Sequence, residues 1–73
     1  KDSYDWIGSP STWGMPEMID NYPEVNAVAV QRLLDAGAII YGKSNVPLKL
    51  SDWQSFNEIY GVTNNPWDPT RTP

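Results

Sequence analysis

The side chains that could carry chemistry in this sequence are serines, lysines and acids, because the chain contains no His and no Cys. A Ser-His-Asp triad is therefore excluded, and so are a disulfide and a metal site built from Cys and His. The carboxylates are scattered along the chain, and no close pair of the kind used by glycosidases stands out. Residue types alone leave the reaction undefined.

One local pattern has the spacing of a nucleotide-binding phosphate loop. Gly37 is followed, after four residues, by Gly42-Lys43-Ser44, which fits G-x-x-x-x-G-K-[ST]. A phosphate loop must connect a strand to a long helix, but here the four intervening residues themselves form the expected strand. Pro47 follows in place of a long helix. We therefore interpret the pattern as a strand between two glycine turns.

Size and charge restrict the class of protein. The chain has 73 residues, a net charge of −4 and nine aromatic residues (four Trp, four Tyr, one Phe). A nucleic-acid partner requires a basic surface, which this composition excludes. The longest apolar run, Ala36–Tyr41, is far shorter than the roughly 20 residues of a membrane span. No signal peptide is apparent, so a cytoplasmic location is the default expectation, and the many aromatic residues suggest part of a larger core.

The first expected element is a strand over residues 1–7, in which Tyr4 and Trp6 share one face. A long connection rich in helix and strand breakers follows over Gly8–Pro23. The clearest element is a helix over Ala27–Ala36, with Asn26 as its predicted N-cap.

The helix face consists of Val30, Leu33 and Leu34, and Gly37 is placed to end the helix in a left-handed conformation. Ala38–Tyr41 is apolar throughout and predicts a buried strand, parallel to the first through a right-handed crossover.

A short helix is expected over Pro47–Trp53, and Ser55–Pro73 is expected to be irregular. The predicted fold class is α/β, with one βαβ unit, a short helix and long loops. Because two strands and a helix do not close a core, we expect a piece of a larger sheet.

Three segments, in order, make the sequence resemble the amidase signature family. Lys1-Asp2 followed by Ser11-Thr12-Trp13-Gly14 is similar to the family's K-D and [ST]-T-x-G. The helix leading into Ala36–Asn45 is similar to its A-G-A-x-x-x-G-K-[ST]-N. The third segment is similar to N-x-x-[YF]-G, N-P-W-[DN] and R-T-P, and comprises Asn57–Gly61, Asn65–Asp68 and Arg71–Pro73.

The resemblance implies a partial amidase domain over residues 1–73, taken from a mixed-sheet α/β/α fold. It implies amide hydrolysis by a Ser–Ser–Lys triad, in which a bridging serine held by a cis peptide links the base to the nucleophile. Lys1 matches the catalytic lysine, and both serines are expected downstream of Pro73. The chain alone is therefore expected to be inactive. The implied partners are a small-molecule amide and the remainder of the domain, and no cofactor is implied.

Other positions carry weaker expectations. Leu50 is a candidate substrate contact, with core packing as the alternative, whereas Trp53 is expected to pack in a core rather than to shape a pocket. Lys43 is expected to be structural rather than catalytic. Ser11 and Thr12 are expected to order the loop near Lys1 through their hydroxyls, with a simple turn as the alternative explanation. Trp67 is expected to pack against its own turn.

One departure from the family bears on the substrate. The transamidating subunits continue G-K-[ST]-N with M-D-E-F, whereas this chain has Val46-Pro47-Leu48-Lys49-Leu50. That difference favours the hydrolytic branch, which includes members acting on fatty, aryl and peptide C-terminal amides. A transamidation subunit remains the alternative, as does a piece that only folds or associates.

Overall fold

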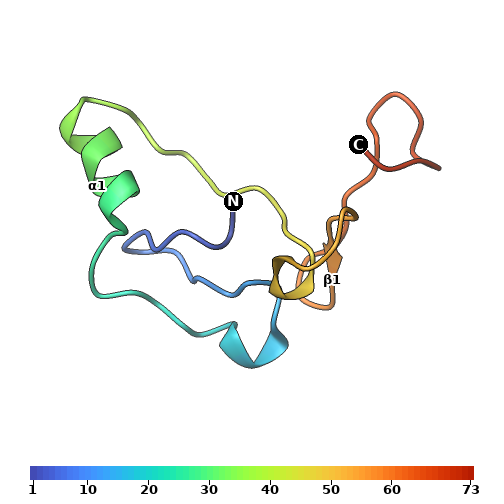
Figure 1. Cartoon of the computed structure of the whole chain (residues 1–73), viewed down its shortest axis with the longest axis horizontal. Coiled ribbons are helices and arrows are strands. Elements are labelled where there is room, and N and C mark those ends of the chain that lie inside the picture. The colour runs from blue at the N-terminus through green and yellow to red at the C-terminus, as the bar shows by residue number, and fades with distance from the viewer.

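The computed structural model describes all residues, 1–73. Its regular elements are short and are joined by long loops. In chain order they are η1 (Pro16–Met18), α1 (Val28–Asp35), η2 (Leu48–Leu50), β1 (Phe56–Asn57) and β2 (Gly61–Val62). α1 lies at one end of the molecule, and the β1–β2 hairpin and the C-terminal loop lie at the other (Figure 1). β1 and β2 pair antiparallel, with Phe56 opposite Val62. The chain is therefore mixed α/β.

Helix α1 lies where the sequence predicts it, but its N-cap differs. Ala27 takes the N-cap position, with no side-chain hydrogen bond to the first turn. The predicted cap, Asn26, instead accepts a hydrogen bond from the Ile7 amide at 2.8 Å and donates one to Gln31. The N-cap prediction is wrong because the Asn26 side chain holds the N-terminal loop instead.

The C-terminal end of α1 agrees with the prediction. Gly37 has φ +91°, in the left-handed region. The Gly37 amide donates to the Leu34 carbonyl and the Ala38 amide donates to the Leu33 carbonyl, both at 3.0 Å. These two bonds form a Schellman motif, which satisfies carbonyls that the end of a helix leaves free.

The two predicted parallel strands are not formed. Residues 1–7 contain turns and a single bridge between Trp6 and Ser9. Residues 38–41 run from α1 towards η2 without regular structure, and Tyr41 is 99% exposed (Figure 1). A strand requires a neighbour with which to exchange backbone hydrogen bonds. Within residues 1–73 no segment pairs with residues 39–43, so the predicted βαβ unit is wrong, although the broader α/β class holds.

The remaining element predictions are met in part. The Gly8–Pro23 connection is irregular apart from η1. The helix predicted over Pro47–Trp53 shortens to η2, because Lys49 and Leu50 have φ of 53° and 61°, which a right-handed helix cannot continue through.

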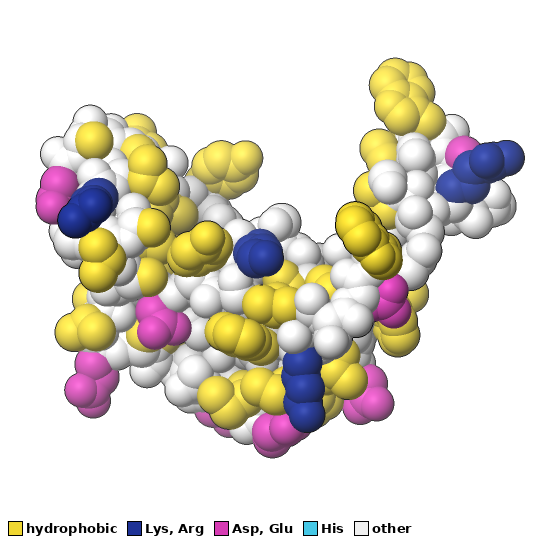
Figure 2. Space-filling view, in the orientation of Figure 1, with side chains coloured by type: hydrophobic (Ala, Val, Ile, Leu, Met, Phe, Trp, Pro, Cys, Tyr) yellow, Lys and Arg dark blue, Asp and Glu magenta, His cyan; other side chains and the backbone are white.

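Few side chains are buried, and most of those are polar. Only 7 of 73 residues are buried, and Val30 and Val46 are the only hydrophobic ones among them. Hydrophobic side chains lie across the face shown in Figure 2. Trp53 and Trp67 are 99% and 94% exposed, so the prediction that they pack is wrong in this chain. Buried polar side chains, rather than an apolar core, therefore form the interior. No helix has the length and hydropathy to cross a membrane.

Candidate functional site

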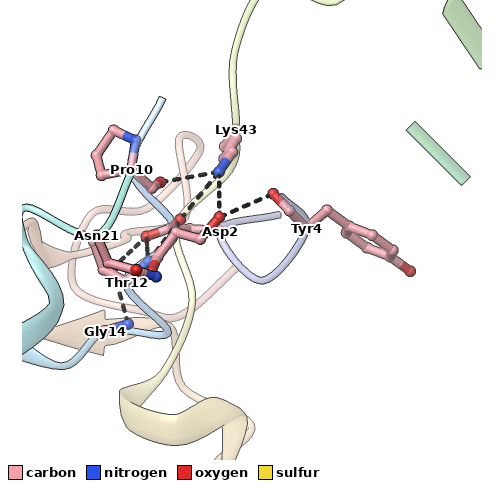
Figure 3. A network of polar contacts seen from close by, with 8 residues as sticks. Asp2, Tyr4, Pro10, Thr12, Gly14, Asn21 and Lys43 are labelled. Carbon is pink, nitrogen blue, oxygen red and sulfur yellow. Dashed lines mark hydrogen bonds and ion pairs between the residues drawn. The ribbon is translucent and has the colours of Figure 1, made fainter. Parts of the chain in front are cut away.

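Asp2 is the centre of the buried polar network (Figure 3). Its carboxylate accepts hydrogen bonds from the amide and the hydroxyl of Thr12. Its backbone amide donates to the Ser44 carbonyl at 3.1 Å, and its carbonyl accepts from the Trp13 amide at 3.2 Å. Since both its backbone and its side chain are bonded, the position of Asp2 is strongly determined.

Lys43 supplies the opposite charge. Its Nζ lies 3.6 Å from Asp2 Oδ1, and the two side chains are only 10% and 5% exposed. Nζ also donates to the Pro10 carbonyl at 2.9 Å and to Ser11 Oγ at 3.1 Å. An ammonium group carries three hydrogens and no acceptor; two of them are donated in these hydrogen bonds, and the charge is paired with Asp2. The arrangement agrees with the expected structural role of Lys43.

The segment from Ser11 to Gly14 also belongs to this polar network. The Thr12 hydroxyl donates to Asp2 and accepts from the Gly14 amide at 3.1 Å, and the Ser11 hydroxyl donates to the Tyr4 carbonyl at 3.3 Å. These bonds confirm that the two hydroxyls order the loop near Lys1.

The chain tightens further at Trp13 and Gly14, the central residues of a turn closed by the Met15 amide on the Thr12 carbonyl. Both have positive φ, 54° and 72°.

A second network joins the loop after Lys43 to the β1–β2 hairpin. Asn57 is buried, and its side-chain amide donates at 2.8 Å both to Asn45 Oδ1 and to the Val46 carbonyl. Its own oxygen accepts from the amides of Ile59 and Tyr60. The hairpin is therefore attached to the segment that follows the ion pair.

Two clefts lie on either side of Lys43. One, of about 390 Å³, is mainly apolar; its lining includes Lys1, Trp6, Val30 and Leu33. The other, of about 320 Å³, is polar and includes Asp2, Asn45 and Tyr60. Lys43 contributes to both. The Asp2–Lys43 pair thus belongs to the wall between an apolar and a polar cleft.

The structure brings some of the predicted site residues together and leaves others apart. Lys1 is exposed and borders the apolar cleft next to Lys43. Leu50 is half-buried and lines a separate shallow pocket with Ser51, Asp52 and Trp53. The roles assigned to Lys1 and Leu50 remain predictions. Among residues 1–73, no group of three or more His, Cys, Asp or Glu side chains is arranged to hold a metal ion.

The C-terminal turn is closed by hydrogen bonds to the carboxylate of Asp68. The Thr70 hydroxyl donates to Asp68 at 2.7 Å, and the Thr70 amide and the Arg71 guanidinium also donate to this carboxylate. The Thr70 hydroxyl above all, then the other two donors, lowers the pKa of Asp68 below its ordinary value. These contacts stabilise an exposed turn.

Comparison with known proteins agrees with the family resemblance. The profile of the Amidase family matches residues 1–73. A glutamyl-tRNA(Gln) amidotransferase subunit of Nitratidesulfovibrio vulgaris is 42% identical over all 73 residues, and an acylamidase of Rhodococcus erythropolis is 45% identical over 60 residues, or 82% of this chain. The corresponding amidotransferase subunit of Methanosarcina acetivorans is 37% identical over 73 residues. The chain belongs to the amidase family. It spans 13–15% of the length of these relatives.

Sequence reasoning did not find the Asp2–Lys43 pair or the role of Asn57. The two charges are 41 positions apart in sequence, and no periodicity connects them. The usable signal was that both residues fall within motifs shared with the family, Lys1-Asp2 and Gly42-Lys43-Ser44-Asn45.

Proposed function

We propose that this chain is part of an enzyme that hydrolyses carboxylic amides, with Lys1 as the proton acceptor of a Ser–Ser–Lys triad. The observation that carries the proposal is the match of the whole chain to the Amidase family. The similarity to an acylamidase over 82% of the chain supports the hydrolytic form. Both serines would come from the rest of the enzyme.

In this mechanism the nucleophilic serine loses its hydroxyl proton to the bridging serine as its oxygen bonds to the amide carbon. The bridging serine passes its own proton to the neutral amine of Lys1. Backbone amides stabilise the oxyanion. The C–N bond then breaks, and the proton returns through the same relay to the leaving nitrogen. Water, activated in the same way, hydrolyses the acyl ester to the free acid.

The contacts of the two lysines support assigning the base to Lys1 rather than to Lys43. The Lys43 ammonium donates two hydrogen bonds and is paired with a buried carboxylate. Loss of a proton from Lys43 would leave Asp2 as an uncompensated buried charge, which is costly. The ammonium of Lys1 forms neither of the two ion pairs in the chain and borders a cleft. We expect the rest of the enzyme to cover Lys1, since burial favours the neutral amine that accepts the proton over the charged ammonium.

The test uses the whole protein and an aryl amide, 4′-nitroacetanilide, with release of 4-nitroaniline as the signal. Lys1→Ala is expected to lower kcat/KM by about 10³-fold or more, because it removes the proton acceptor. Lys49→Ala is the matched control, since Lys49 is also exposed and has no role in the mechanism. A Lys1→Ala variant that keeps most of the wild-type rate would remove Lys1 from the mechanism.

A second candidate function is that of an amidotransferase component, because two relatives of that description match all 73 residues. The run Val46–Leu50, in place of M-D-E-F, favours hydrolysis. The same protein distinguishes the two functions. Multiple turnovers of the aryl amide by the purified protein alone support the hydrolase. Release of ammonia from glutamine only with partner subunits and glutamyl-tRNA(Gln) present would favour the amidotransferase.

A further inference from the structure

We infer that Lys43 is a positioning residue for Lys1: the buried Lys43–Asp2 pair fixes the backbone next to Lys1, which borders the apolar cleft. The inference rests on the proposed function, because it assumes that Lys1 is the base. It adds a role for a second lysine, which takes no proton itself.

The first step of the argument is that Asp2 cannot move independently of Lys43. The Asp2 side chain is 5% exposed and lies between Lys43 on one side and Thr12 on the other. Its backbone is bonded in both directions, to Ser44 and to Trp13. Figure 3 shows the Lys43–Asp2 ion pair. Ser44 is the neighbour of Lys43, so the side-chain ion pair and the backbone bond from Asp2 to Ser44 join the same two segments.

The second step is that Lys1 takes its position from Asp2. The Lys1 carbonyl lies in the peptide unit that joins it to Asp2, and it accepts from the amides of Ser3 and Tyr4 at 2.8 and 3.4 Å. The Cα of Lys1 is therefore one peptide unit away from Asp2, whose backbone and side chain are both hydrogen-bonded. No strand pairing involves residues 1–5. The network around Asp2 holds the residues next to Lys1, and the Ala27 amide, which donates to the Asp5 carbonyl at 2.9 Å, holds the loop further along.

The third step concerns how sensitive the reaction is to this position. Proton relay requires the amine and the hydroxyl to meet at hydrogen-bonding distance. A displacement of about 1 Å in a catalytic group can lower a rate by about 100-fold. Changing the contacts of Lys43 should therefore lower kcat while leaving KM nearly constant, because Lys43 positions the base and holds no substrate.

The experiment must separate positioning from stability, and the pair offers a way to do so. Lys43→Met leaves Asp2 buried without its cation, so both stability and rate should fall. The double variant Lys43→Met/Asp2→Asn removes both charges, and its denaturation midpoint should return towards that of the wild type. In the whole protein with 4′-nitroacetanilide, we expect the kcat of the double variant to stay about 10- to 100-fold low, with KM within about threefold. A double variant that regains both the midpoint and the wild-type kcat would show that the pair is purely structural.

If the double variant does not fold, Lys43→Arg tests whether Lys43 positions Lys1. Arginine keeps the charge, but its planar fork cannot occupy the place of a compact ammonium. A kcat about tenfold lower at an unchanged midpoint supports positioning, and a wild-type kcat overturns it. Lys1→Ala, measured in parallel, keeps the two proposals separate. If Lys1→Ala abolishes turnover while the double variant keeps its kcat, only the role of Lys43 fails. If Lys1→Ala keeps its rate, the proposed function fails.

Discussion

Substitution of Gly14 tests how closely the loop that orders Asp2 packs against η2. Gly14 has φ +72°, and a methyl group added to it would lie 3.1 Å from Asn57 Cβ, 3.1 Å from Leu48 Cα and 3.2 Å from the Pro47 carbonyl oxygen. Two of these neighbours are backbone atoms, and Asn57 is buried and held by four hydrogen bonds. None of the three can turn away to make room.

Two costs add in Gly14→Ala. The left-handed conformation costs an L residue about 1–2 kcal/mol, and overpacking a filled site costs about 1–3 kcal/mol. We therefore expect a loss of about 2–5 kcal/mol in the free energy of unfolding. Gly8→Ala is the matched control, because Gly8 has φ +91° and no atom within 4 Å of the added methyl. Only the conformational cost of about 1–2 kcal/mol applies there.

The measurement is chemical denaturation of the whole protein, wild type and both variants, followed by tryptophan fluorescence. The Gly14 variant should be less stable than the Gly8 variant by about 1–3 kcal/mol, which is the contact cost alone. Equal losses in the two variants would refute the close packing of Gly14 against Leu48 and Asn57.

Two further predictions concern single hydroxyl groups. Thr12→Val should destabilise the protein by about 1–3 kcal/mol, because it removes one donor from the buried Asp2 carboxylate and leaves the Gly14 amide without its side-chain acceptor. Thr12→Ser, which keeps the hydroxyl, should lose much less in the same denaturation assay, and equal losses would contradict the network. The pKa of Asp68, followed by NMR titration, should lie below the ordinary value for aspartate and rise in Thr70→Val. Since the folded-state pKa is lowered, the stabilisation of the turn should be complete above about pH 4 and be lost as the pH falls through the folded-state pKa; an unperturbed pKa would contradict the Thr70 contact.

The sequence was sufficient for features that depend on neighbouring residues. The position of α1 follows from the spacing of Val30, Leu33 and Leu34, and its end follows from the freedom of Gly37 to take a positive φ. The ordering of the loop by Ser11 and Thr12 was also predicted, since short hydroxyl side chains readily bond nearby backbone groups. The family was predicted from three motifs in order, and the profile match confirms it.

Features that depend on a distant partner were not predictable in this way. Asn26 has the composition of an N-cap, but its oxygen is used by Ile7, 19 residues away. Residues 38–41 have the composition of a buried strand, yet a strand requires a partner segment, and none pairs with them within residues 1–73. A local sequence pattern shows that a residue can cap a helix or pair in a strand, but it does not show which distant residue it contacts.

The candidate site also has features that the sequence predicts and features that depend on a distant partner. The sequence by itself predicted that Lys1 matches the catalytic lysine of the amidase family, and it established that residues 1–73 contain no His or Cys. Only the tertiary structure decided that Lys43 lies against Asp2 in a buried network and that Lys1 borders a cleft beside it. The reason is physical: a buried charge is stable only with a partner, and folding alone brings that partner from 41 residues away.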